Sequence, residues 1–158
     1  MKTSNITLGK DVIVDSTTSI NNVTIQNNVK IAKHCSIYGS ESNILEIGSE
    51  TYIGMFSIIN GFSEKVTIGN NVSIAQNVNI MSDSGPNASS EMQKYFPLIK
   101  GKVVIGDHCW IGANVVIMPN VILSEFCVVA ANSFVNSSFP PYSVIGGNPA
   151  KLIKTITK

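Results

Sequence analysis

The sequence predicts an all-β fold in which short strands wind into a solenoid, and three features of the chain indicate it. An aliphatic residue recurs at every sixth position over most of the 158 residues. Small residues often follow that position directly, and Asn often stands three positions after it. An amphipathic helix needs apolar spacings of three and four, and an ordinary strand needs alternation, so neither explains a period of six. Stacked coils of short strands explain it.

The six-residue register is unbroken in the C-terminal half and interrupted three times before it. Two interruptions are short, at residues 39–46 and 60–67, and one is long, at residues 81–104. We expect the long one to leave the solenoid as an extruded loop, since a loop of this length in a compact fold usually has a function. The repeating aliphatic positions are Leu8, Val14, Ile20; Ile25, Ile31, Ile37; Ile47, Ile53, Ile59; Ile68, Ile74, Ile80; and Ile105, Ile111, Ile117, Leu123, Val129, Val135.

Each repeat carries its own turn and core positions. The Asn residues suit corners with a left-handed backbone, which Asn tolerates better than other non-glycine residues. One position later comes a second small apolar side chain, and all three cysteines occupy this position, so we interpret them as buried hydrophobes. The Asn set is Asn28, Asn71, Asn77, Asn114, Asn120 and Asn132; the following set is Val29, Val72, Val78, Val115 and Val121 with Cys35, Cys109 and Cys127.

Composition limits the possible partners and the number of domains. The length fits a single domain, 1–158, with a short C-terminal tail at 136–158. A formal net charge of +1 argues against a nucleic-acid partner. The first ten residues lack the apolar core of a signal peptide, and no apolar run approaches the roughly 18 residues of a membrane span. We therefore expect a cytoplasmic protein without membrane insertion.

Large apolar residues occupy the outward position of the repeats that follow the long interruption. Monomers seldom expose contiguous apolar patches, so we interpret this set as one stripe that forms the interface of a closed homotrimer. The set comprises Trp110, Val116, Ile122, Val128 and Phe134, with Tyr52 and Ile58 further back.

Two segments resemble a known family. Residues 105–114, IGDHCWIGAN, and residues 140–151, PPYSVIGGNPAK, are similar to the C-terminal signature of the hexapeptide-repeat acyltransferases. The likeness is greatest to the maltose, galactoside, xenobiotic and polysaccharide sugar O-acetyltransferases. The resemblance implies a left-handed parallel β-helix of about six triangular coils. It also implies transfer of an acetyl group from acetyl-coenzyme A to a sugar or glycan hydroxyl, at the interface between subunits and without a metal.

The same resemblance implies where coenzyme A lies. Trp110 would line the cofactor groove, and the backbone near Gly112, Ala113 and Ala131 would contact the pantetheine arm. Two ammonium groups near the C-terminus, those of Lys151 and Lys154, would face the phosphates. An alternative reading of the lysines is a solvated tail charge.

The chain departs from the family at the catalytic base. The family's loop histidine corresponds to Gly85 here, and the nearby ionisable residue is Asp83, followed by Ser84. We predict that these two residues position the acceptor, because a carboxylate with an ordinary pKa near 4 is a weak base toward a hydroxyl. The two histidines, His34 and His108, both replace corner Asn residues, and His108 is the better catalytic candidate because its coil receives the loop.

The missing histidine leaves three other functions open. Transfer to an amino sugar needs a weaker base, so N-acetylation is one alternative. A degenerate, non-catalytic β-helix is a second. A γ-type carbonic anhydrase is a third, but it needs a three-histidine zinc site, and the chain has only two histidines.

Overall fold

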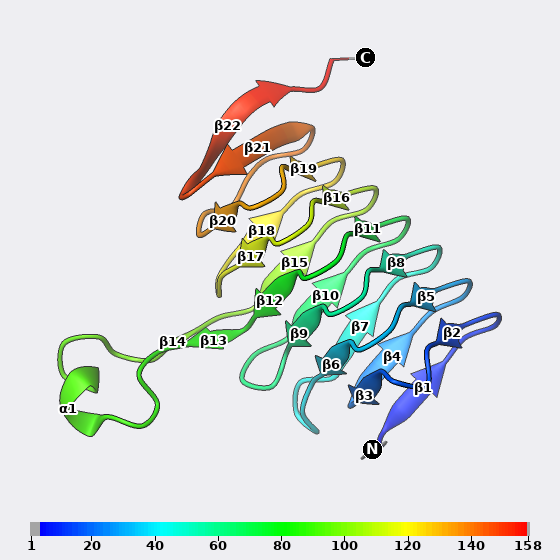
Figure 1. Cartoon of the computed structure of the whole chain (residues 1–158), viewed down its shortest axis with the longest axis horizontal. Coiled ribbons are helices and arrows are strands. Elements are labelled where there is room, and N and C mark those ends of the chain that lie inside the picture. Colours follow the sequence, from blue (N-terminus) through cyan, green and yellow to red (C-terminus); the bar gives the residue numbers. More distant parts are fainter. Residues whose placement is uncertain (1–3, 158) are drawn as a thin grey trace.

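A computed structural model of the chain describes residues 4–157. The chain winds through three parallel sheets in turn, so each coil contributes one strand to each side of a triangular prism (Figure 1). We name the sides face A, face B and face C, and the corners after the faces they join.

The strands of each face are stacked in chain order. Face A contains β1 (Ile6–Leu8), β4 (Val23–Ile25), β7 (Leu45–Ile47), β10 (Val66–Ile68), β15 (Val103–Ile105) and β18 (Ile122–Leu123). Face B contains β2 (Ile13–Val14), β5 (Lys30–Ile31), β8 (Tyr52–Ile53), β11 (Ser73–Ile74), β16 (Trp110–Ile111), β19 (Val128–Val129), β21 (Ser143–Gly147) and β22 (Ala150–Thr155). Face C contains β3 (Ser19–Asn21), β6 (Ser36–Tyr38), β9 (Ile58–Asn60), β12 (Asn79–Met81), β17 (Val116–Ile117) and β20 (Phe134–Val135).

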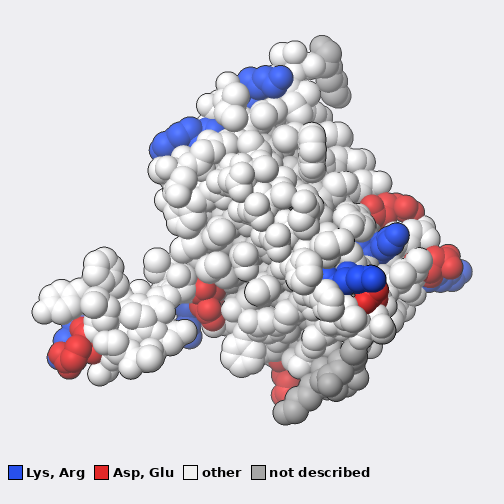
Figure 2. Space-filling view, viewed as in Figure 1, with Lys and Arg blue, Asp and Glu red and all other residues white. Residues whose placement is uncertain are grey.

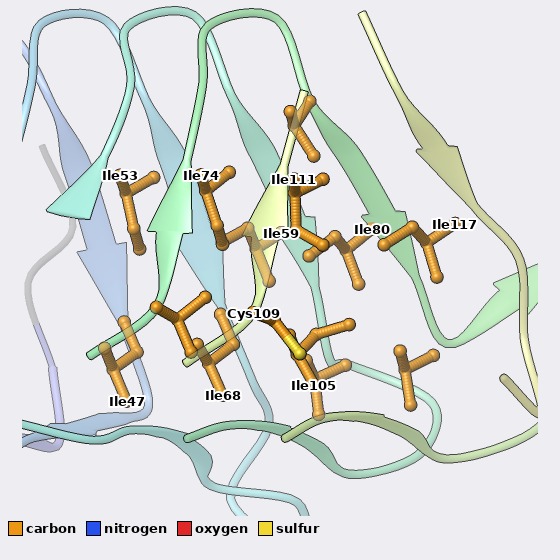
Figure 3. Packing of buried hydrophobic residues seen from close by; sticks show 14 of the residues in the cluster. Ile47, Ile53, Ile59, Ile68, Ile74, Ile80, Ile105, Cys109, Ile111 and Ile117 are labelled. Carbon is orange, nitrogen blue, oxygen red and sulfur yellow. The ribbon is translucent and has the colours of Figure 1, made fainter. Parts of the chain in front are cut away.

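The predicted core positions from Ile20 onward fill the interior of the prism. Two predicted positions of the first coil do not: Leu8 is 50% exposed and Val14 is half-buried, because their strands β1 and β2 are at the edges of the sheets. Isoleucines from successive coils lie side by side in rows, as Ile47, Ile68 and Ile105 do from face A (Figure 3). Each of these side chains is at most 1% exposed, and burying one contributes about 1.5–3 kcal/mol. The three cysteines are buried as free thiols, as predicted, and burial raises the pKa of the Cys35 thiol.

The corner residues adopt the predicted left-handed backbone. All six corner Asn residues of the repeat have positive φ. Both histidines do too, with φ 57° at His34 and 58° at His108. Backbone hydrogen bonds join equivalent corners of successive coils. For example, the Asn71 N–H donates to the Ser49 carbonyl at 2.8 Å. Each six-residue repeat therefore consists of one short strand and one corner.

The three interruptions all leave the prism at the C–A corner, where face C passes into face A. The long one is more regular than a plain loop: β13 (Asp83–Ser84) pairs antiparallel with β14 (Ile99–Lys100) and carries α1 (Ser90–Gln93) at its tip. Strands β12 and β15 also extend into residues 81–104, to Met81 and from Val103. In Figure 1 the excursion stands clear of the prism.

The expected C-terminal tail, described over residues 136–157, also contains more regular structure than a plain tail. Phe139 bridges to Leu123 of face A, β21 continues face B in parallel, and β22 folds back antiparallel to β21. Pro140 and Pro141 break the six-residue spacing here, which is why the sequence pattern hides a further part-coil. Among residues 4–157, no helix is long and apolar enough to cross a membrane.

Candidate active site

The residues predicted to hold coenzyme A lie on face B. Trp110 is opposite Val128 in the parallel register, Val128 is opposite Val144, and Val144 is opposite Lys154. Directly opposed residues share one side of a sheet, so the indole and the Lys154 ammonium lie in one outward column. Three strand spacings separate them, about 14 Å. The Trp110 side chain is 60% exposed, which a core role would not allow.

Lys151 lies on the same edge strand. It pairs with Gly146 of β21, while Lys154 pairs with Val144, and both lysines are exposed. Within residues 4–157, neither lysine forms an ion pair with a carboxylate. Two unneutralised ammonium groups at one end of a face are suited to phosphate.

The B–C corner beside this column is built from small residues. Gly112 and Ala131 occupy equivalent corners of adjoining coils, and a Cβ at Gly112 would come within 2.6 Å of the Ala131 nitrogen. Glycine is therefore required at position 112. The Ala113 carbonyl accepts from Asn132 at 2.9 Å. Within the described chain, the amide N–H groups of Ala113 and Ala131 donate no hydrogen bond, so they can donate to a ligand carbonyl.

Asp83 and Ser84 lie on a different part of the prism. Both are half-buried in β13, at the root of the excursion, where Asp83 is opposite Lys100 and Ser84 is opposite Ile99. The adjacent Ser82 is fully buried; its N–H donates to Asn60 at 2.9 Å, and its carbonyl accepts from Gly101 at 2.9 Å. These bonds fix the position from which the excursion starts.

Two residues that the sequence analysis missed surround the Asp83 carboxylate. The Ser63 hydroxyl donates to Asp83 Oδ2. Burial, together with the charge of Asp83, raises the pKa of Tyr38, so the phenol stays protonated. Tyr38 and Ser63 come from the coils that precede Asp83 at the C–A corner. The one available signal was that Tyr38 directly precedes an interruption of the repeat, while Ser63 and Asp83 lie within interruptions.

The histidines are corner residues, as their replacement of Asn suggests. His108 stacks on Phe126 with ring centroids 4.6 Å apart, and Phe126 stacks on Tyr142 at 5.0 Å. His34 stacks on Phe56 at 5.1 Å at the B–C corner. The aromatic stack places His108 at the A–B corner, away from Asp83. His108 stays the alternative to Asp83 as the catalytic residue.

The structure thus separates the predicted site into two halves. Trp110, Lys151 and Lys154 lie on face B, and Gly112, Ala113 and Ala131 lie at its edge, the B–C corner. Asp83 and Ser84 lie at the C–A corner, which is the corner opposite face B in a triangular prism (Figure 1). One chain therefore does not bring its own Asp83 to its own Trp110.

The predicted apolar stripe does not exist as one surface. Its members alternate between faces because consecutive repeats belong to consecutive faces: Trp110 is on face B, Val116 on face C and Ile122 on face A. The sequence interpretation missed this because it read the outward position along the chain. Two columns result, and a polar residue interrupts each one. They are Tyr52, Ser73, Trp110 and Val128 on face B, and Ile58, Asn79, Val116 and Phe134 on face C.

Charge is sparse on the visible side of the prism. In Figure 2 the Lys, Asp and Glu side chains are scattered over a mostly uncharged surface. Among residues 4–157, no group of three or more His, Cys, Asp or Glu side chains is placed to hold a metal ion.

Comparison with known proteins shows which family the chain is similar to. Residues 102–137 match the family described as bacterial transferase hexapeptide, six repeats. An Escherichia coli dTDP-4-amino-4,6-dideoxy-D-glucose acyltransferase is 32% identical over 143 residues, which cover 87% of this chain and 73% of that protein. The chain belongs to the hexapeptide-repeat acyltransferases.

Two further relatives show the range of this hexapeptide-repeat family. Galactoside O-acetyltransferase from E. coli is 34% identical over 121 residues, which cover 76% of this chain but only 58% of that enzyme, so the match spans less than two thirds of its length. A variant of AntD, an N-acyltransferase from Bacillus cereus, has been solved with dTDP-4-amino-4,6-dideoxyglucose and coenzyme A. It superposes with a TM-score of 0.85 at 26% identity, covering 98% of this chain and 85% of that one.

Proposed function

We propose that this chain is an acetyltransferase that moves an acetyl group from acetyl-coenzyme A to a sugar, at sites shared between the subunits of a homotrimer. The relatives support acyl transfer to sugars as the class of reaction. The observation that carries the shared site is the separation of Asp83 from Trp110 on opposite sides of the prism. Asp83 of one copy would face the cofactor column of the next.

Coenzyme A would lie along face B. The ammonium groups of Lys151 and Lys154 would bind its phosphates, and Trp110 would cover the groove. The amide N–H groups of Ala113 and Ala131 would donate to pantetheine carbonyls, since they have no partner within residues 4–157.

In the proposed transfer, the acceptor oxygen or nitrogen attacks the thioester carbonyl carbon. The C–S bond breaks, coenzyme A leaves as the thiol, and the proton of the acceptor is transferred to the solvent or to the leaving sulfur. Asp83 and Ser84 would orient the acceptor by hydrogen bonds, with Ser63 holding the carboxylate in place. Orientation supplies much of the rate in such reactions.

Amino-sugar N-acetylation is a second candidate, and the residue at position 85 favours it. Gly85 replaces the family's loop histidine, so the excursion carries no imidazole to deprotonate a hydroxyl. An unprotonated amine is nucleophilic without such a base. Two of the compared proteins are named for, or solved with, a nucleotide-linked amino sugar.

A matched pair of acceptors separates the candidates. Thiol release from acetyl-coenzyme A would be followed with dTDP-4-amino-4,6-dideoxyglucose, with its 4-hydroxy counterpart, and with neutral oligosaccharides. Turnover with a hydroxyl acceptor supports O-acetylation, and turnover with the amine alone supports N-acetylation. If coenzyme A binds but no acceptor releases thiol, the chain is a degenerate member of the family.

A further inference from the structure

One cavity belongs to no part of the predicted site, and its lining is linked to Asp83 through Phe62 and the adjacent Ser63. It occupies the C–A corner on the N-terminal side of the excursion and has a volume of ≈ 570 Å³. Ser40, Ser42, Asn21 and Asn22 line it together with Phe62. A cavity of this size accommodates a small organic ligand.

Phe62 presents its ring to this cavity from a fixed backbone. The ring is 59% exposed, yet both of its main-chain polar groups are held. Its N–H donates to Asn60 Oδ1 at 2.9 Å, and its carbonyl accepts from Asn43 Nδ2 at 3.3 Å. A large exposed ring on a backbone fixed at both ends is a platform rather than a loosely placed side chain.

The platform is continuous with the proposed acceptor site. Phe62 is followed by Ser63, whose hydroxyl donates to Asp83. One loop, between β9 and β10, therefore holds the Asp83 carboxylate and lines the cavity. The Phe62 ring and the hydroxyl that contacts Asp83 therefore come from adjacent residues of the same loop.

The lining selects a class of ligand. Hydroxyl and amide groups can both donate and accept, as sugar hydroxyls require, and an aromatic face packs against the C–H groups of a sugar ring. The one ionised group in the lining is the carboxylate of Glu41, which repels phosphate. The chemistry fits a neutral sugar ring and not a diphosphate.

We propose that this cavity binds a neutral sugar unit of a glycan acceptor, stacked on Phe62, next to the unit that is acetylated near Asp83. The inference rests on the proposed sugar acetyltransferase function and makes its acceptor an oligosaccharide or polysaccharide. The neutral sugar unit would fill the cavity beside Phe62. A free monosaccharide bound near Asp83 would leave that cavity empty.

Binding of neutral disaccharides tests the proposal without any acetyl transfer. Maltose, lactose and cellobiose would be titrated against the full chain in saturation-transfer NMR, in the absence of acetyl-coenzyme A. We expect at least one disaccharide to bind, with Phe62→Ala weakening it about tenfold and Phe62→Trp retaining it. Phe56→Ala is the matched control, because that ring is 51% exposed but lies at the B–C corner.

The outcomes are separable from failure of the proposed function. If no disaccharide binds the wild-type chain, or if Phe62→Ala binds as well as Phe56→Ala does, the sugar subsite is refuted even where thiol release continues. If dTDP binds this corner and depends on Phe62, the ligand is a nucleotide and the proposal is wrong. Sugar binding without any thiol release would leave the subsite intact and refute the transferase.

Discussion

Restoring activity by mixing two inactive chains is the sharpest test of a shared site. One chain would carry Asp83→Asn, which removes the acceptor half at the C–A corner. The other would carry Trp110→Ala with Lys154→Glu, which damages the cofactor half on face B. The two chains would be co-expressed with different tags, and trimers that contain both would be isolated.

The expected activity follows from the arrangement of the two halves. If each site takes Asp83 from one copy and face B from the next around a closed ring, every mixed trimer has one site whose halves are both intact. Thiol release per mixed trimer should then be about one third of the wild-type rate. It would be measured with acetyl-coenzyme A below its KM, where damage to face B is fully expressed.

A site built within one chain gives a different result. Each chain of the mixture would then carry one damaged half, and the mixed trimers would stay as inactive as either parent. Trimers of two differently tagged Asp83→Asn chains provide the background rate. Activity at that background in the mixed trimers would refute the shared site.

Four further measurements check the remaining parts of the reasoning. Sedimentation velocity should give a trimer, and a monomer at micromolar concentration would contradict the assembly. In calorimetry, Trp110→Ala with Lys154→Ala should weaken coenzyme A binding at least about tenfold, because a packed ring and a phosphate contact are both lost; Lys30→Ala, at the far end of face B, should not. Ile74→Ala should lower the free energy of unfolding by about 2–5 kcal/mol in denaturant titrations, because it opens a cavity between stacked coils. His108→Asn should keep turnover within about threefold, because Asn tolerates the same left-handed corner; a loss above about a hundredfold with folding intact would identify His108 as the base.

The coil architecture could be predicted because each repeat encodes it locally. A buried Ile such as Ile74, a left-handed Asn such as Asn71 and a small buried Val such as Val72 are short-range requirements, and they recur at fixed spacing. Where the six-residue repeat is interrupted, less of the structure could be predicted. The proline pair at 140–141 hid the part-coil that ends in β21, and the long excursion gave no period from which β13 and β14 could be inferred.

The proposed cofactor residues come from the resemblance, and the residues around the proposed acceptor site could be predicted only in part. Trp110 lies on the signature segment, so its outward placement was expected. Tyr38 and Ser63 were not, because they belong to different coils and lie in no shared motif. Only stacking of the coils places them beside Asp83.

The sequence by itself determined the strand period, the corners and the interior, because these depend on contacts within a repeat and between equivalent positions of adjacent repeats. The tertiary structure decided which face each repeat occupies. A residue's face depends on its place within a coil of three, so Val116 and Trp110, equivalent in the period of six, point in different directions. The same rotation puts Asp83 opposite Trp110, and that separation is what indicates a site shared between chains.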